Sequence, residues 1–258
     1  MSPVRRLPWR TGPACRLGLA LLCGGLARGQ FTESAAPVEP GKWLWEADLF
    51  NAGRDRAGGA EYRYEAFGYL QWTRGVRESF DLQFGMQAYQ RETYAEPGLP
   101  VRRDERWGDL CLRSKWLLPA SSRPWEVALL PFVSVPLDDD AEGHRHVHLG
   151  LILPVSRPLG RSGWFDAQVQ LDGSKWGGER RDWSLLASAN VQRDLGAGWG
   201  GYLEVVGDFA DGWRRAAVSG GFGLTRTLGR GGIDAALYGG VTGEAVDWEL
   251  ALRLYWEI

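Results

Sequence analysis

The last thirteen residues decide the fold class: Val246-Asp247-Trp248-Glu249-Leu250-Ala251-Leu252-Arg253-Leu254-Tyr255-Trp256-Glu257-Ile258. Every second residue from Val246 is apolar, and most of the residues between them are charged or polar. Because successive side chains of a β-strand point to opposite faces, one face of this strand suits hydrocarbon and the other suits water. The stretch therefore predicts a β-strand that separates lipid from an aqueous interior.

The same alternation continues upstream as far as Trp43, with no helical periodicity. Most of the predicted strands are 8–12 residues long, close to the ~9–11 residues that a strand needs to cross a bilayer. We expect strands near 43–50, 62–72, 78–89, 107–117, 125–136, 146–157, 163–172, 183–193, 198–208, 214–226, 232–241 and 246–257. The sequence thus predicts an all-β fold, a transmembrane antiparallel up-and-down β-barrel of about 12 strands over residues 43–258.

The connections between these strands alternate in length. Five are compact, and the other six, including 51–61 and 90–106, are mostly longer and more polar. Bacterial outer-membrane barrels have short periplasmic turns and long outer loops, with aromatic residues at both membrane surfaces. Most of the 14 tryptophans fall at the predicted strand ends, where the indole ring suits the boundary between headgroups and hydrocarbon.

The N-terminus predicts export. Arg5, Arg6, Arg10 and Arg16 precede or open a short apolar stretch, and Ala27-Arg28-Gly29 supplies small residues for cleavage, so residues 1–29 are predicted as a signal peptide. Residues 30–42 follow as a flexible N-terminal lead-in. The mature chain has 25 basic and 32 acidic residues, a net charge of −7. This acidic balance argues against nucleic-acid binding.

Many charged residues fall on the face opposite the apolar one. On a lipid face each basic group would cost ~2–4 kcal/mol near the bilayer midplane, so we expect them to line the lumen. The candidate lumen-lining residues are Asp109, Arg113, Lys115, Glu126, Asp166, Glu204, Asp247, Glu249 and Arg253, and Arg63 and Glu65 are expected inside as well. Two readings stay open: a charged pore lining that selects solutes, or an ion-paired plug that closes a narrow barrel.

No other group of residues indicates a catalytic or metal-binding site. His144, His146 and His148 lie near Asp138–Asp140, but solvated charge is also expected at a loop, and we predict no metal site and no cofactor. After cleavage Cys111 is the remaining cysteine, which excludes an internal disulfide. No nucleophile elbow, phosphate loop or zinc motif occurs, so no catalytic residue is expected.

Several short motifs resemble one known family. They are Trp107-Gly108-Asp109-Leu110 with Lys115, Leu117-Leu118-Pro119, Ala128 to Pro131 through Val135-Pro136, Leu153-Pro154-Val155-Ser156, Tyr238 to Thr242, and Asp247. Together they resemble the outer-membrane transporters grouped as "MetA-pathway of phenol degradation". Pro136 is followed by Leu137-Asp138 where the family has Thr-Gly, and the chain ends in Ile258 where barrels usually end in an aromatic residue. The resemblance implies a barrel that passes hydrophobic or aromatic compounds.

The sequence therefore predicts a bacterial outer-membrane channel for small, hydrophobic or aromatic solutes, working by passive diffusion and without enzymatic activity. The expected partners are outer-membrane lipid, the barrel-insertion machinery and a small-molecule solute, with no nucleic acid. A non-conducting barrel that anchors the envelope is the alternative. A lipase-like barrel enzyme is a further one.

Overall fold

The computed structural model describes residues 31–57, 59–119, 124–138, 147–175, 181–210 and 215–258, and over these the chain is almost entirely β-strand. The signal peptide, His144 and His146 lie outside the described residues. The strands are β1 (Trp43–Ala57), β2 (Ala60–Arg77), β3 (Phe80–Ala95), β4 (Arg102–Arg106), β5 (Asp109–Leu117), β6 (Glu126–Pro136), β7 (His148–Pro158), β8 (Gly163–Lys175), β9 (Arg181–Gly196), β10 (Trp199–Ala210), β11 (Arg215–Leu228), β12 (Gly231–Gly240) and β13 (Trp248–Glu257). No helix among the described residues is long and apolar enough to cross a membrane.

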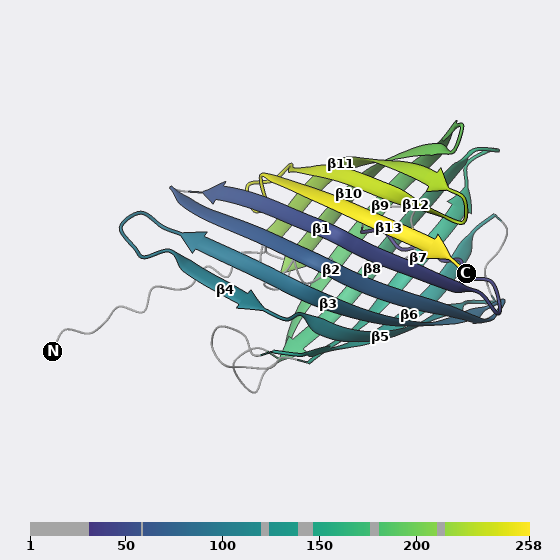
Figure 1. The fold of residues 1–258 in the computed structure, drawn as a ribbon, viewed down its shortest axis with the longest axis horizontal. Helices are drawn as coiled ribbons and strands as arrows, with labels where there is room; N and C mark the ends of the chain where they lie inside the picture. The colour runs from purple at the N-terminus through teal and green to yellow at the C-terminus, as the bar shows by residue number, and fades with distance from the viewer. Residues whose placement is uncertain (1–30, 58, 120–123, 139–146, 176–180, 211–214) are drawn as a thin grey trace.

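The strands form one closed antiparallel barrel (Figure 1). Neighbours in sequence pair with each other around the ring, and β1 pairs with β13 to close it. The segments β4 and β5 both pair with β3, at different heights, and are separated at Trp107 and Gly108. They act as one interrupted strand, so the thirteen segments make a barrel of twelve strands, as predicted.

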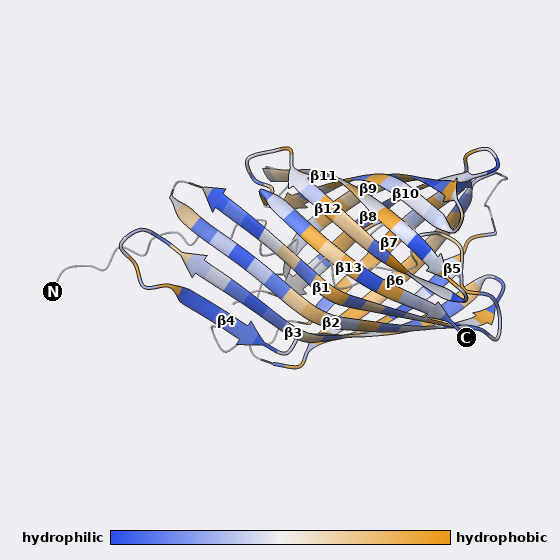
Figure 2. Ribbon diagram, turned by 45° about the horizontal axis from the view of Figure 1, so that its top comes forward, coloured by the Kyte–Doolittle hydropathy of each residue, from blue (hydrophilic) through white to orange (hydrophobic). Residues whose placement is uncertain are grey.

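Hydrophilic and hydrophobic residues alternate along the strands (Figure 2), and their distribution between the two faces is inverted relative to a water-soluble protein. Large apolar side chains such as Phe84, Leu203 and Phe222 are exposed on the outside, whereas Asp81, Lys115 and many other polar groups are buried inside. Soluble proteins bury apolar side chains and expose charges. A barrel surrounded by hydrocarbon requires the opposite distribution.

Tryptophans mark both ends of the barrel. One end carries the short turns, and here Trp43, Trp45, Trp199 and Trp256 are exposed. Trp107, Trp183 and Trp248 are exposed toward the long-loop end. These two groups occupy the positions of the aromatic girdles that flank the apolar band of transmembrane barrels. The short-turn end also holds the C-terminus (Figure 1).

Two predicted loops are mostly strand. Residues 51–61 and 90–106 were expected to be long loops, but β1, β2 and β3 run on through them and β4 adds a further hairpin strand. Ion pairs such as Arg54–Glu61 at 2.9 Å hold these extensions together. Beyond the membrane band the outward face of a strand meets water instead of lipid, so outward positions such as Arg63 are polar although the backbone pairing continues.

The prediction that Arg63 and Glu65 face the lumen is wrong. On β2 the buried positions are Tyr62, Tyr64 and Ala66, and Arg63 is exposed. The inward set changes at Gly68, which has a φ of +68°, so that Tyr69 and Gln71 are buried further along. A local irregularity of this kind moves every following side chain to the other face. Strict alternation carried back from Gln71 and Tyr69 therefore assigns Arg63 and Glu65 to the wrong face.

The lipid-facing assignment gives a stability prediction. Leu252 lies midway between Trp248 and Trp256 on the outward face of β13, so Leu252→Arg should destabilise the barrel by about 2–4 kcal/mol in vesicles. Guanidinium unfolding followed by tryptophan fluorescence measures the loss. Val241→Arg is the matched control, because Val241 is highly exposed beyond the end of β12 and should tolerate the charge. Equal stability of Leu252→Arg and the unaltered protein would contradict the lipid-facing assignment.

Candidate functional site

The interior of the barrel is the candidate functional site, and it collects most of the predicted lumen-lining residues. Those buried inside, each at most 4% exposed, are Arg113, Lys115, Asp166, Glu204, Glu249 and Arg253. Asp109 and Glu126 are half-buried near the ends of β5 and β6. Asp247 precedes β13, which begins one residue later, and its side chain is exposed.

Buried polar contacts join strands of the wall inside the barrel. The Arg253 guanidinium on β13 contacts Asp48 of β1, with Nε 2.5 Å from Oδ1, and lies 3.9 Å from the Glu46 carboxylate. Tyr202 donates a hydrogen bond of 2.9 Å to Asp234 on β12. Charges exposed to a water-filled channel would remain accessible, so their burial shows that the interior is closed by side chains at this height.

A segment of the chain itself runs through this interior. The expected flexible lead-in, residues 30–42, includes a stretch that lies inside the barrel, Phe31–Val38, which we call the lumen segment. Thr32, Glu33, Ser34 and Ala35 are each at most 1% exposed. The lumen segment therefore plugs the barrel together with the ion pairs of the wall.

The first half of the lumen segment, residues 31–33, is held by hydrogen bonds of its backbone and side chains. The Thr32 amide donates to Glu204 Oε1 at 2.7 Å, and the Thr32 hydroxyl lies 2.5 Å from the same oxygen and 2.8 Å from the Ser188 hydroxyl. The Gln168 side chain accepts from the Glu33 amide and donates to the Phe31 carbonyl, both at 2.8 Å. These partners satisfy the buried amides of Thr32 and Glu33 and the carbonyl of Phe31.

The other half of the lumen segment contacts β7 and β3. The Ala35 amide donates to Ser156 Oγ at 2.9 Å, and the Val38 amide donates to Asp81 Oδ2 at 3.0 Å. Gly75 gives the chain room to leave, because a Cβ atom there would lie 2.0 Å from the carbonyl oxygen of Glu39. Beside it, the Gly41 amide donates to the Gly75 carbonyl at 2.9 Å.

Lys42 ties the start of β1 to the end of β13. Its ammonium lies 2.7 Å from both Glu257 and Glu39. Hydrogen bonds to Glu257 and Glu39 raise the pKa of Lys42. Trp43 and Ile258 exchange backbone hydrogen bonds of 3.0 and 2.9 Å at the same place. The lumen segment is thus anchored at the short-turn end, and its far end lies deeper in the barrel.

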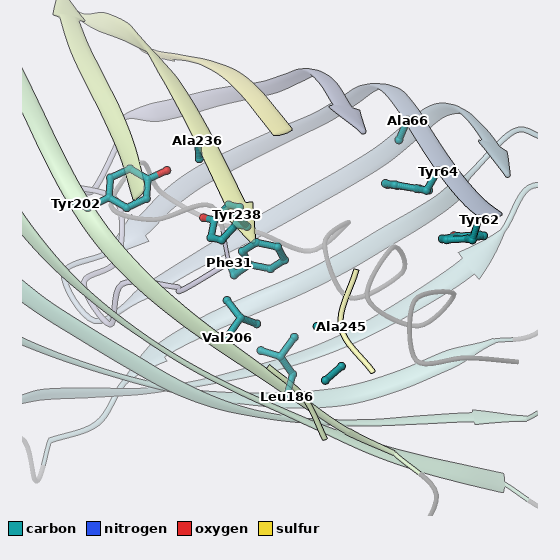
Figure 3. Packing of buried hydrophobic residues seen from close by; sticks show 11 residues of the cluster. Phe31, Tyr62, Tyr64, Ala66, Leu186, Tyr202, Val206, Ala236, Tyr238 and Ala245 are labelled. Atoms are coloured by element: carbon teal, nitrogen blue, oxygen red, sulfur yellow. The ribbon is translucent and has the colours of Figure 1, made fainter. Parts of the chain in front are cut away.

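Two apolar clusters inside the barrel were not predicted. In one, Phe31 packs edge-on against Tyr238 with ring centroids 4.8 Å apart, near Val206 and Leu186 (Figure 3). The other joins Ala35 to a buried apolar wall made of Cys111, Ala128, Leu130, Phe132 and Ile152. Both faces of β6 are apolar, so the alternation that reveals inward-facing charges carries no signal there. Nothing in the sequence of the lumen segment indicates insertion, except one acid, Glu33, among small residues.

The histidine cluster lies only partly within the described residues. His148 is on β7, and its Nδ1 is 3.6 Å from Asp172 Oδ1. Over the ranges that the structure describes, no group of three metal-ligating side chains is assembled.

No protein-family model matches the chain, and a search of curated proteins finds no match. Solved structures do match. An outer-membrane channel from Pseudomonas putida F1 superimposes with a TM-score of 0.68 at 13% identity, over 91% of this chain and 100% of that one. The chain shares its fold with that barrel.

Two further barrels match less closely. The β domain of the Bordetella autotransporter BrkA has a TM-score of 0.54 at 12% identity, over 83% of this chain and 98% of that one. The translocator domain of the autotransporter NalP from Neisseria meningitidis also has 0.54, at 10% identity, over 85% and 89%. At such identities the likeness concerns the fold, so the family expected from the short motifs stays a prediction.

The contacts of Thr32 predict how firmly the lumen segment is held. Thr32→Val removes its hydroxyl and leaves Glu204 with fewer donors, which should lower the opening free energy of the segment by about 1–3 kcal/mol. Amide hydrogen exchange of residues 31–38 measures this change, and exchange in the barrel strands should stay the same. Thr242→Val is the matched control, because Thr242 bonds to the β11 backbone in a loop. Faster exchange throughout the barrel would contradict a local role.

Proposed function

We propose that this protein is a bacterial outer-membrane channel that passes small solutes by passive diffusion. In the resting state, its own lumen segment closes the channel. The observation that carries the proposal is a closed barrel with an apolar outer surface and a polar interior occupied by a segment of the chain that does not belong to the barrel strands. The fold match to a protein described as an outer-membrane channel supports it. Lipid surrounds the barrel, and insertion machinery delivers it.

The lumen segment is suited to leaving without unfolding the barrel. Its contacts with the wall are hydrogen bonds, an ion pair and small apolar contacts, and none of them belongs to the strand pairing that closes the ring. One end is anchored at Lys42 and Trp43. Displacement of the segment would leave the twelve-stranded wall intact and open a path along its axis.

The apolar clusters favour hydrophobic or aromatic solutes. Tyr238, Val206 and Leu186 on one side, and the apolar wall on the other, offer surface to a ring or short chain within a polar interior. Apolar surface beside polar groups is usual where proteins bind small organic molecules.

Removal of the lumen segment should open the channel. In planar bilayers the unaltered protein should show small or rare conductance steps, and deletion of residues 31–38 should give larger and longer ones, because the deletion removes the segment from the lumen. The absence of steps with the deletion variant over many insertions would contradict a channel. That outcome would favour the non-conducting, anchoring barrel.

An engineered disulfide supplies the control within one protein. Ala35 and Cys111 belong to the same buried cluster, so Ala35→Cys adds a second thiol to that cluster. The oxidised form, verified by mass, should stay closed, and reduction should restore the behaviour of the unaltered protein.

Solute preference is tested by liposome swelling with sugars, amino acids and phenolics in parallel. We expect phenolics to permeate the deletion variant faster than sugars of similar size, because the apolar clusters then line the path. Equal rates for all three classes would support an unselective pore and remove the proposed preference for aromatic solutes.

A further inference from the structure

Aromatic side chains form a belt on the outside of β1–β4, below the strand extensions. Phe50, Phe67 and Tyr89 are in ring contact, with centroids 5.2 Å apart for the first two and 6.3 Å apart for the last two. Trp107, which follows β4, is 61% exposed. Aromatic rings of this kind mark the level where lipid headgroups meet hydrocarbon. The outward side chains that follow toward the long loops therefore lie at the level of the headgroups or beyond it.

Two rows of outward side chains follow this belt, and they differ in charge. In the first row Arg91 of β3 lies between Glu65 of β2 and Glu105 of β4, and it forms an ion pair with Glu65. The first row therefore supplies its own acids. The members of the second row, paired in turn across β1, β2, β3 and β4, are Arg54, Arg63, Thr93 and Arg103. These four described residues include three arginines and no acid, and like charges on neighbouring strands of a sheet repel each other.

A single carboxylate, that of Glu61 on β2, is shared by three of the arginines on this face. Its Oε1 lies 2.9 Å from Arg54 Nη2 and also contacts Arg63, and its Oε2 lies 3.7 Å from Arg56 Nε. The Nε of Arg54 is buried without a hydrogen-bond partner. Arg103 is exposed two strands away from Arg63 in the same row. We call Arg54, Arg56, Arg63 and Arg103 the arginine patch, and one shared acid leaves it with an excess of positive charge.

Other acids at this end of the barrel face the interior. Glu92 and Asp104 lie in one row with Tyr64, which is buried. Asp55 faces inward as well, and burial, followed by the nearby Asp247, raises the pKa of its carboxyl group. The excess positive charge of the arginine patch therefore lies on the outside of the sheet, where the extensions project beyond the rest of the barrel (Figure 1).

We propose that the arginine patch binds the phosphate groups of a phosphorylated glycolipid of the outer leaflet. Guanidinium groups bind phosphate through paired N–H donors. Arg63 lies four residues beyond Phe67, about 13 Å along β2 at ~3.3 Å per residue and less in height because the strands are tilted. The acyl chains of the lipid lie against the aromatic belt, and its phosphates reach the arginines above. The inference requires an outer-membrane barrel and does not depend on whether that barrel conducts.

Titration of the purified full-length chain in detergent with diphosphoryl lipid A, without divalent cations, tests the patch. Arg63→Gln combined with Arg103→Gln should weaken binding at least about fivefold, because two charged donors to phosphate are lost. Glu61→Gln should tighten binding, because it removes the acid that competes with phosphate. The matched control is Arg74→Gln combined with Arg226→Gln, which removes two arginines that lie over tryptophan rings at the short-turn end. This control should bind lipid A like the unaltered protein.

Two further probes identify the group that is bound. Lipid A without phosphates should bind the unaltered protein more weakly than diphosphoryl lipid A, and a large excess of inorganic phosphate should not displace the lipid. Equal binding of the two lipids, or unchanged binding in the Arg63 and Arg103 double variant, overturns the proposal. Displacement by inorganic phosphate would assign the patch to soluble anions and overturns the lipid site. The gel mobility of unheated samples reports folding, and Arg103→Gln alone replaces a double variant that does not fold.

Discussion

The structure depends on the pairing of β1 with β13. Backbone N–H and C=O groups have no water to bond with in hydrocarbon, so a membrane-spanning sheet must have no edge. The ring closes along Leu44–Arg54, and the two chain ends meet where Trp43 and Ile258 exchange hydrogen bonds. Once this closure exists, every side chain is assigned either to the outer surface or to the interior.

Closure of the ring also places many charged side chains in the small interior, where each charge needs a partner. Within the wall, Arg253 pairs with Asp48 and Glu46. Glu33 of the lumen segment contacts Arg113 and Lys115 of the wall. The closed state therefore includes contacts made by a segment that does not belong to the ring of strands.

The strand extensions at the long-loop end are stabilised differently from the strands of the membrane band. The ion pairs Arg54–Glu61 and Glu65–Arg91 lie where water, not lipid, surrounds the strands. Each of these pairs is therefore weak and depends on salt concentration. They keep β1, β2 and β3 rigid beyond the band without adding to its closure. The barrel is consequently asymmetric, with a tall side formed by β1–β4 (Figure 1).

The sequence by itself determined the fold class and the strand number, because period-two alternation reports directly which solvent each face meets. The stretch from Val246 to Ile258 shows this alternation most clearly, and its Glu249 and Arg253 are buried. Only the tertiary structure decided which side chains of β2 point inward before Gly68. It also decided that residues 51–61 and 90–106 are mostly strand and where the lumen segment lies. The outward face of the strand extensions meets water instead of lipid, so the alternation of a lipid-facing strand ends there, and contacts such as Glu33 with Arg113 join residues 80 apart in the chain. No local pattern records a partner at that distance, since the partner is chosen by the closed barrel and not by neighbouring residues.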